Sequence, residues 1–292
     1  MATSSSSLVP GISLADHLGN NIKVLVLLAL VDRLVISPAL SAACKREKDV
    51  VHGRWFFTHA FANLLVVLTS LGSVAAVLRD PFNAMDVDTH RDISLFGSGS
   101  VWPLTIINSV HVYHMLGGFG LSSADYFHHG LFIPTLGFPG QIFAFGAGAN
   151  WQAFFISGLP GGIDYFVLGL IRCGLANKMF EKRLSANLNV WLRNPGILSA
   201  TFILYQSLVY GKVSAPYFVC ALQLILPPYN AMYYCKQSVA NYAVHYMLGK
   251  LNMANRVKQR ISITLGGSVM DWEDALGEML PKKMLAEPQR GS

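Results

Sequence analysis

Seven apolar stretches, separated by polar segments, dominate this sequence of 292 residues. They cover residues 22–43, 56–78, 101–120, 127–147, 152–171, 197–210 and 215–235. A helix needs about 20 mostly apolar residues to cross a bilayer, and most of these stretches are that long. Charged residues make up only 13% of the chain, about half their share in soluble domains. The sequence therefore predicts an all-α, polytopic membrane bundle of about seven transmembrane helices, and excludes a secreted disulfide scaffold or a nucleic-acid binder.

The ends of the chain and the weaker stretches qualify this division. Residues 1–20 are polar, and we predict that they form a disordered tail. We assign residues 21–49 to the first transmembrane helix and residues 252–292 to a cytosolic carboxyl-terminal tail. The first stretch is interrupted by Asp32 and Arg33, which we interpret as a snorkelling pair or an interhelical contact. The sixth stretch is short, and the seventh is interrupted by prolines.

Lys and Arg residues are unevenly divided between alternate loops. Seven spans would place 17 of them, including Arg193, on one side of the membrane and 4 on the other. Because cytosolic loops carry the excess of positive charge, this pattern predicts a lumenal amino terminus and a cytosolic carboxyl terminus.

Polar side chains inside the apolar stretches are the main functional signal. Such groups are costly in lipid and usually face the interior of the bundle. His114 and His128 each lie seven residues from Leu121, the centre of the turn between the third and fourth stretches, so they share one depth. We predict that a single polar layer in the cytosolic half contains His59, Asn63, His111, His114, Asp125, His128, His129 and Asp164.

Two of these features have alternative interpretations. Asp164 could form a structural ion pair with Arg172, two turns further along its helix. Gly158 and Gly162 are spaced for close helix packing, although the neighbouring Pro160 could instead break the helix and open a cavity.

Three sequence elements together carry a family resemblance. They are Arg54-Trp55-Phe-Phe-Thr58-His59, then Asp80-Pro81, then Asp125-Tyr-Phe-His128-His129. This pattern resembles the TLC-domain family, which includes the ceramide synthases and the translocation-associated membrane protein, and it would cover residues 50–251. The resemblance implies an integral membrane protein of the endoplasmic reticulum that acts in lipid homeostasis, including that of sphingolipids.

The resemblance to the ceramide synthases is partial. Those enzymes carry a second acidic motif on the following span, and here only Asp164 is a counterpart. We therefore expect a protein that binds, senses or moves a membrane lipid in the polar layer. It would need no cofactor and no nucleic acid, and it is a candidate homo-oligomer.

The first alternative is a His-dependent acyltransferase with acyl-CoA as co-substrate. A neutral His can remove a proton from an amine or alcohol while a carboxylate orients the ring. The catalytic residues would be His128, His129, Asp125 and Asp164. The substrate-binding residues would be His59, Asn63, His111 and His114.

A remote alternative is a membrane hydroxylase that uses a His cluster to hold metal. The segments His111-x-x-His114 and Asp125-x-x-His128-His129 resemble the histidine clusters of membrane di-iron hydroxylases. Because Asp125 replaces the first His of an HxxHH box, we predict no metal site.

Overall fold

The computed structural model describes residues 8–44, 46–251, 263–265 and 268–270. In this part of the chain the helices join end to end into seven rods. The rods are α1 (Leu14–Val31), η1 (Asp32–Ile36) and α2 (Ser37–Ala43); α3 (Glu47–Arg79); α4 (Trp102–Leu116); α5 (Ser123–Phe132), η3 (Ile133–Gly137) and α6 (Phe138–Ile142); α7 (Gly148–Ala153), η4 (Phe154–Gly158) and α8 (Leu159–Arg172); α9 (Lys178–Leu188), η5 (Asn189–Arg193) and α10 (Asn194–Val209); and α11 (Tyr217–Leu251).

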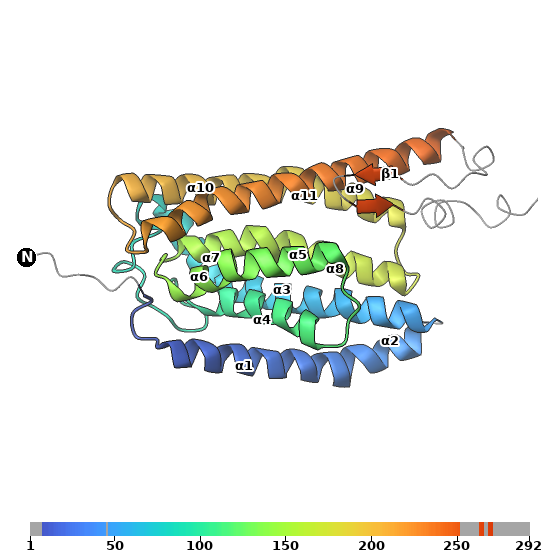
Figure 1. Ribbon diagram of the computed structural model, residues 1–292, viewed down its shortest axis with the longest axis horizontal. Coiled ribbons are helices and arrows are strands. Elements are labelled where there is room, and N and C mark those ends of the chain that lie inside the picture. The colour runs from blue at the N-terminus through green and yellow to red at the C-terminus, as the bar shows by residue number, and fades with distance from the viewer. Residues whose placement is uncertain (1–7, 45, 252–262, 266–267, 271–292) are drawn as a thin grey trace, which may run out of the picture.

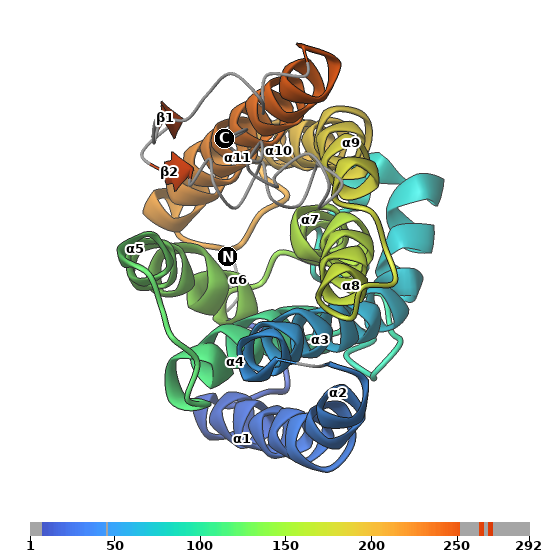
Figure 2. The same ribbon diagram turned by 90° about the vertical axis from the view of Figure 1, so that its right-hand side faces the viewer.

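Three shorter elements complete the described structure. A 3₁₀ turn, η2 (Pro81–Asn83), follows α3, and strands β1 (Ile263–Leu265) and β2 (Ser268–Met270) form an antiparallel hairpin. The rods lie side by side along the long axis (Figure 1). Viewed along that axis, α1 and α2 lie outside a ring formed by the other rods (Figure 2).

The predicted helical fold is confirmed. Three helices are long and apolar enough to cross a membrane, namely Leu14–Ala43, Glu47–Arg79 and Gly148–Arg172. The first of them contains Asp32 and Arg33 and remains helical through this pair.

Two predicted boundaries are wrong in the described residues. Helix α1 begins at Leu14, within the predicted disordered tail, because the Ser13 hydroxyl and the Asp16 carboxylate form a capping box. The sixth rod begins at Lys178 rather than near residue 197, because the polar α9 continues without a break into α10. Residues 1–7 of the predicted tail lie outside the described residues, as do residues 252–262, 266–267 and 271–292.

Wide π turns recur at one kind of position. The four in the described chain, η1, η3, η4 and η5, each end two residues before a proline. These prolines are Pro38, Pro139, Pro160 and Pro195. A proline within a helix lacks an N–H donor, and its ring clashes with the carbonyl four residues earlier. A local widening relieves that clash and lets the rod continue.

A buried ion pair joins the outer rod to the ring. Arg54 on α3 donates two hydrogen bonds to the Asp32 carboxylate, at 2.9 and 2.5 Å. The Tyr113 hydroxyl on α4 donates a third, at 2.6 Å. The interpretation of Asp32 as an interhelical contact is confirmed. Arg33 is exposed, donates to the Gly117 carbonyl, and its Nε lies 3.8 Å from Asp32 Oδ2.

Small residues let α8 approach α3 closely. A Cβ atom added at Gly158 would lie 3.2 Å from the Val66 side chain, and one at Gly162 would lie 3.4 Å from the Asn63 Cβ. The packing interpretation of this glycine pair is confirmed. The alternative, in which Pro160 interrupts the regular helix, also applies, because Gly158 ends the π turn η4 two residues before Pro160.

Candidate functional site

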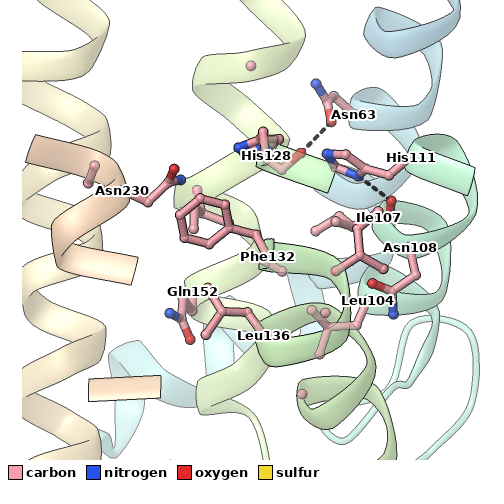
Figure 3. Close-up of a pocket in the computed structure, with 18 of the residues that line it drawn as sticks. Asn63, Leu104, Ile107, Asn108, His111, His128, Phe132, Leu136, Gln152 and Asn230 are labelled. Carbon is pink, nitrogen blue, oxygen red and sulfur yellow. Dashed lines mark hydrogen bonds between the residues drawn. The ribbon is translucent and has the colours of Figure 1, made fainter. Parts of the chain in front are cut away.

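A cavity of about 350 Å³ lies among the six rods of the ring. Side chains from α3, α4, α5, α8, η5 and α11 contribute to its wall. It is lined by seven of the eight residues predicted to form the polar layer, namely His59, Asn63, His111, Asp125, His128, His129 and Asp164. Figure 3 shows His111 and His128 on facing elements of this cavity.

The histidines form one contiguous cluster. The ring centroid of His111 lies 5.8 Å from that of His128, 5.1 Å from that of His129 and 5.9 Å from that of His59. Three rods separated in sequence therefore bring their imidazoles to one level. The rings are close enough to contact one another, and all four of these histidines border the cavity.

His114 is the exception, because it does not line the cavity. Its side chain is fully buried behind His59, and its ring stacks on Trp55 with a centroid distance of 4.1 Å. Neither ring nitrogen has a hydrogen-bond partner among the described residues. His114 shares the predicted depth, but it packs within the wall.

Two hydrogen bonds orient the histidines of the cavity. The His111 Nδ1 lies 2.7 Å from the Ile107 carbonyl oxygen, and because a carbonyl only accepts, this nitrogen must donate. Its Nε2 is then the acceptor of the neutral ring. The Tyr234 hydroxyl lies 3.3 Å from the His128 Nδ1.

Neither predicted catalytic carboxylate forms a hydrogen bond with a histidine in the described part of the chain. Asp125 Oδ2 accepts from the backbone N–H and the hydroxyl of Ser122, at 2.8 and 2.7 Å, which caps α5. Asp164 Oδ2 accepts from the Ser185 hydroxyl at 3.2 Å. The alternative pairing of Asp164 with Arg172 is wrong, because Arg172 pairs with Asp49 at 3.7 Å.

Several polar residues of the cavity were not predicted from the sequence. Arg193, counted as a loop charge, instead lines the cavity from the π turn η5 and donates to Asn189 Oδ1 at 2.7 Å. Its Nε has no hydrogen-bond partner in the described structure, and neither has Oδ1 of Asp164. Tyr165 stacks on His59 with a centroid distance of 4.2 Å. The unusually short sixth apolar stretch was the signal that its helix begins earlier.

The other end of the cavity is mainly apolar. Leu104, Leu136 and Leu204 line it together with Met85 and Phe145, and Gln152 and Gln223 are among its polar members. Along the fourth rod, His128 and Gly140 are 12 residues apart, a helical rise of roughly 18 Å. The polar and apolar ends of the cavity are thus separated by about half the thickness of a bilayer.

In the described residues, no group of three or more His, Cys, Asp or Glu side chains is placed to hold a metal ion. The arrangement can therefore donate and accept hydrogen bonds at one end and cover a hydrocarbon at the other. No family model, curated protein or solved structure matches this chain.

Proposed function

We propose that this protein is a multipass membrane protein whose cavity binds a membrane lipid in order to sense or move it. The observation that carries this proposal is the change from polar to apolar lining along one cavity. Histidine, Asp164 and Arg193 would bind the polar group of the lipid. The five apolar residues at the other end would cover its hydrocarbon.

The membrane topology forms part of this proposal. We propose that all seven rods cross the membrane, with the carboxyl terminus in the cytosol. Three rods meet the length and apolarity of a span by themselves. The junctions after Ala43 and Arg172 lie with the end of α11 at one end of the bundle (Figure 1). The rod ends there carry most of the Lys and Arg of the described chain.

The resemblance to the TLC-domain family gives independent support for a lipid ligand. It stays a prediction from the three sequence elements, and it suggests the endoplasmic reticulum as the membrane. Two of those elements supply His59 and the pair His128 and His129, and all three residues line the cavity.

An acyltransferase using acyl-CoA is the second candidate. It is favoured by the contact between Tyr234 and His128 and by the acceptor nitrogen of His111, since either ring could take a proton from an attacking hydroxyl or amine. Against it, the carboxylates of Asp125 and Asp164 bond to serines. A neutral histidine that must become cationic would then lack the acidic partner that stabilises it.

One experiment separates the two candidates. Purified protein is incubated with a mixed acyl-CoA pool and a membrane lipid extract, then analysed for retained lipid and for new amides or esters by mass spectrometry. A binder retains lipid and forms no new product, and His128→Ala lowers retention by about 5- to 100-fold, as loss of a hydrogen-bonding partner would. The matched control, His52→Ala, changes an exposed histidine outside the cavity.

A new product whose formation falls about 100-fold or more in His128→Ala would instead establish the acyltransferase. If the wild-type protein retains no lipid and forms no product, both candidate functions are contradicted.

A further inference from the structure

Two buried side chains that the sequence did not single out line the apolar end of the cavity. Met85 lies between η2 and α4, and Phe145 lies in the loop between α6 and α7. They are 3% and 4% exposed, and both belong to a buried apolar cluster with Val77 and Leu204. We call Met85 and Phe145 the floor of the cavity.

The backbone holds the Met85 side chain of this floor in place. The Gly148 N–H donates to the Ala84 carbonyl at 3.0 Å, which ties α7 to the residue before Met85. A Cβ atom added at Gly148 would overlap the Met85 thioether. Met85 therefore packs directly on the α7 backbone and has little room to withdraw.

The distance from the histidines to the floor can be counted along three rods. It is 12 residues from His128 to Gly140, 11 from Tyr234 to Gln223 and 16 from Tyr165 to Ala149. At 1.5 Å per residue these separations are roughly 16 to 24 Å. An extended hydrocarbon advances roughly 1.3 Å per carbon, given bonds of about 1.5 Å. The space therefore matches a chain of about 12 to 18 carbons.

The cavity volume limits the number of chains. Packed hydrocarbon chains lie about 4.5 Å apart, near van der Waals contact, so one chain about 18 Å long fills roughly 360 Å³. The cavity volume of about 350 Å³ agrees with one such chain. A second chain would need roughly twice that volume.

We infer that the cavity selects a single-chain amphiphile, and that Met85 and Phe145 set the length of the chain it accepts. This inference rests on the proposed lipid-binding function. It adds the class of ligand and names two residues that determine its specificity. The polar group would lie at the histidines, and the chain would end against the floor.

The test uses the full-length protein and a defined probe. Purified protein is incubated with an equimolar mixture of saturated fatty acids and monoacylglycerols of about 10 to 24 carbons, together with a two-chain phospholipid, and retained species are identified by native mass spectrometry. We expect retention of single-chain species with a maximum between about 12 and 18 carbons.

Two substitutions should move that maximum in opposite directions. Met85→Ala removes the Cγ, Sδ and Cε atoms from the floor and should lengthen the preferred chain by about two to three carbons. Ala149→Leu adds side-chain atoms at the same end and should shorten it by a similar amount. Val77→Ala is the matched control, because Val77 shares the buried cluster but does not line the cavity.

The outcomes separate this inference from the proposed function. Retention of the two-chain phospholipid alone, or an unchanged chain-length maximum in both cavity variants, would overturn the inference while lipid binding stands. Absence of any retained lipid in the wild-type protein would overturn the proposed function and this inference with it. Should Met85→Ala fail to fold, Ala149→Leu and Phe145→Leu still give opposite expected shifts.

Discussion

Asp32 and Asp164 both lie inside the helical bundle, yet their surroundings differ. Asp32 is fully buried and accepts two hydrogen bonds from Arg54 and one from Tyr113. Asp164 lines the cavity and accepts one hydrogen bond from Ser185, and its second oxygen has no hydrogen-bond partner in the described part of the chain. The first carboxylate is satisfied by the protein, whereas one oxygen of the second is buried beside the cavity without a hydrogen-bond partner among the described residues.

Under the proposed function, this difference distinguishes a structural carboxylate, Asp32, from one that binds the ligand, Asp164. An ionised group buried without partners is costly, so its partners are part of the folded state. A carboxylate that lines a cavity can be completed by a ligand instead. The cations differ in a similar way, since Arg54 donates two hydrogen bonds to Asp32, whereas Arg193 donates one to Asn189 and its Nε has no partner among the described residues.

The largest effect should follow from Asp32→Ala. The substitution leaves the Arg54 guanidinium buried without its counter-ion, which costs about 3–5 kcal/mol. We expect a large loss of folded protein in detergent and a much lower midpoint in thermal unfolding. The double variant Asp32→Leu with Arg54→Met should recover most of this loss, because it removes both charges. A stability within about 0.5 kcal/mol of wild type in Asp32→Ala would contradict the structural role.

A second prediction concerns Asp164→Asn, which keeps the shape of the side chain and removes its charge. Since the Ser185 hydroxyl can still donate to the amide oxygen, we expect thermal stability within about 1 kcal/mol of wild type. Retained lipid, measured by mass spectrometry of the purified protein, should fall by about 5- to 100-fold. If Asp164→Asn unfolds as Asp32→Ala does, or retains lipid fully, the two carboxylates do not differ in the proposed way.

The smallest effect concerns Asp80, a carboxylate outside the candidate spans. Hydrogen bonds from the side chain and backbone N–H of Asn83 hold the pKa of Asp80 below its usual range. Its stabilising effect on η2 is therefore present at neutral pH and is lost only as pH falls through that lowered value, below about 4. In hydrogen–deuterium exchange, the backbone amides of residues 80–86 should be equally protected at about pH 7 and pH 5, after correction for intrinsic exchange rates.

The variant Asp80→Asn should lower that protection at both pH values. Protection that already falls between about pH 7 and pH 5 in the wild-type protein would indicate a raised pKa instead.

Counting residues from a turn predicted much of the site. The helical rise placed His114 and His128 at one depth, and the predicted polar layer around them included His111 and His129. The ring centroids of His111, His128 and His129 lie within 6 Å of one another. Depth could not place His114, because the direction of its side chain depends on how α4 packs against Trp55. The helical class also followed from the sequence, and an interhelical contact of Asp32 was one of the two interpretations that the sequence left open.

Other features depended on competition between local interactions. Asp125 follows Ser122 by three residues, the spacing of a capping box, so its carboxylate caps α5 rather than orienting a histidine. Arg193 was assigned to a loop because the polar α9 carries no apolar signal for a span. Met85 and Phe145 lie in connections between rods, and only the packing of three separate segments brings them together at the floor.

The central claim is that one cavity holds a lipid with its polar group at the histidines and its chain against the floor. An experimental density map of the wild-type protein in lipid nanodiscs tests it most directly. We expect continuous, unbranched density from the level of His111 and His128 to Met85 and Phe145, with its wider end beside Asp164 and Arg193. A cavity filled by protein side chains, or His128 and Asp164 facing different sides of the bundle, would contradict the account.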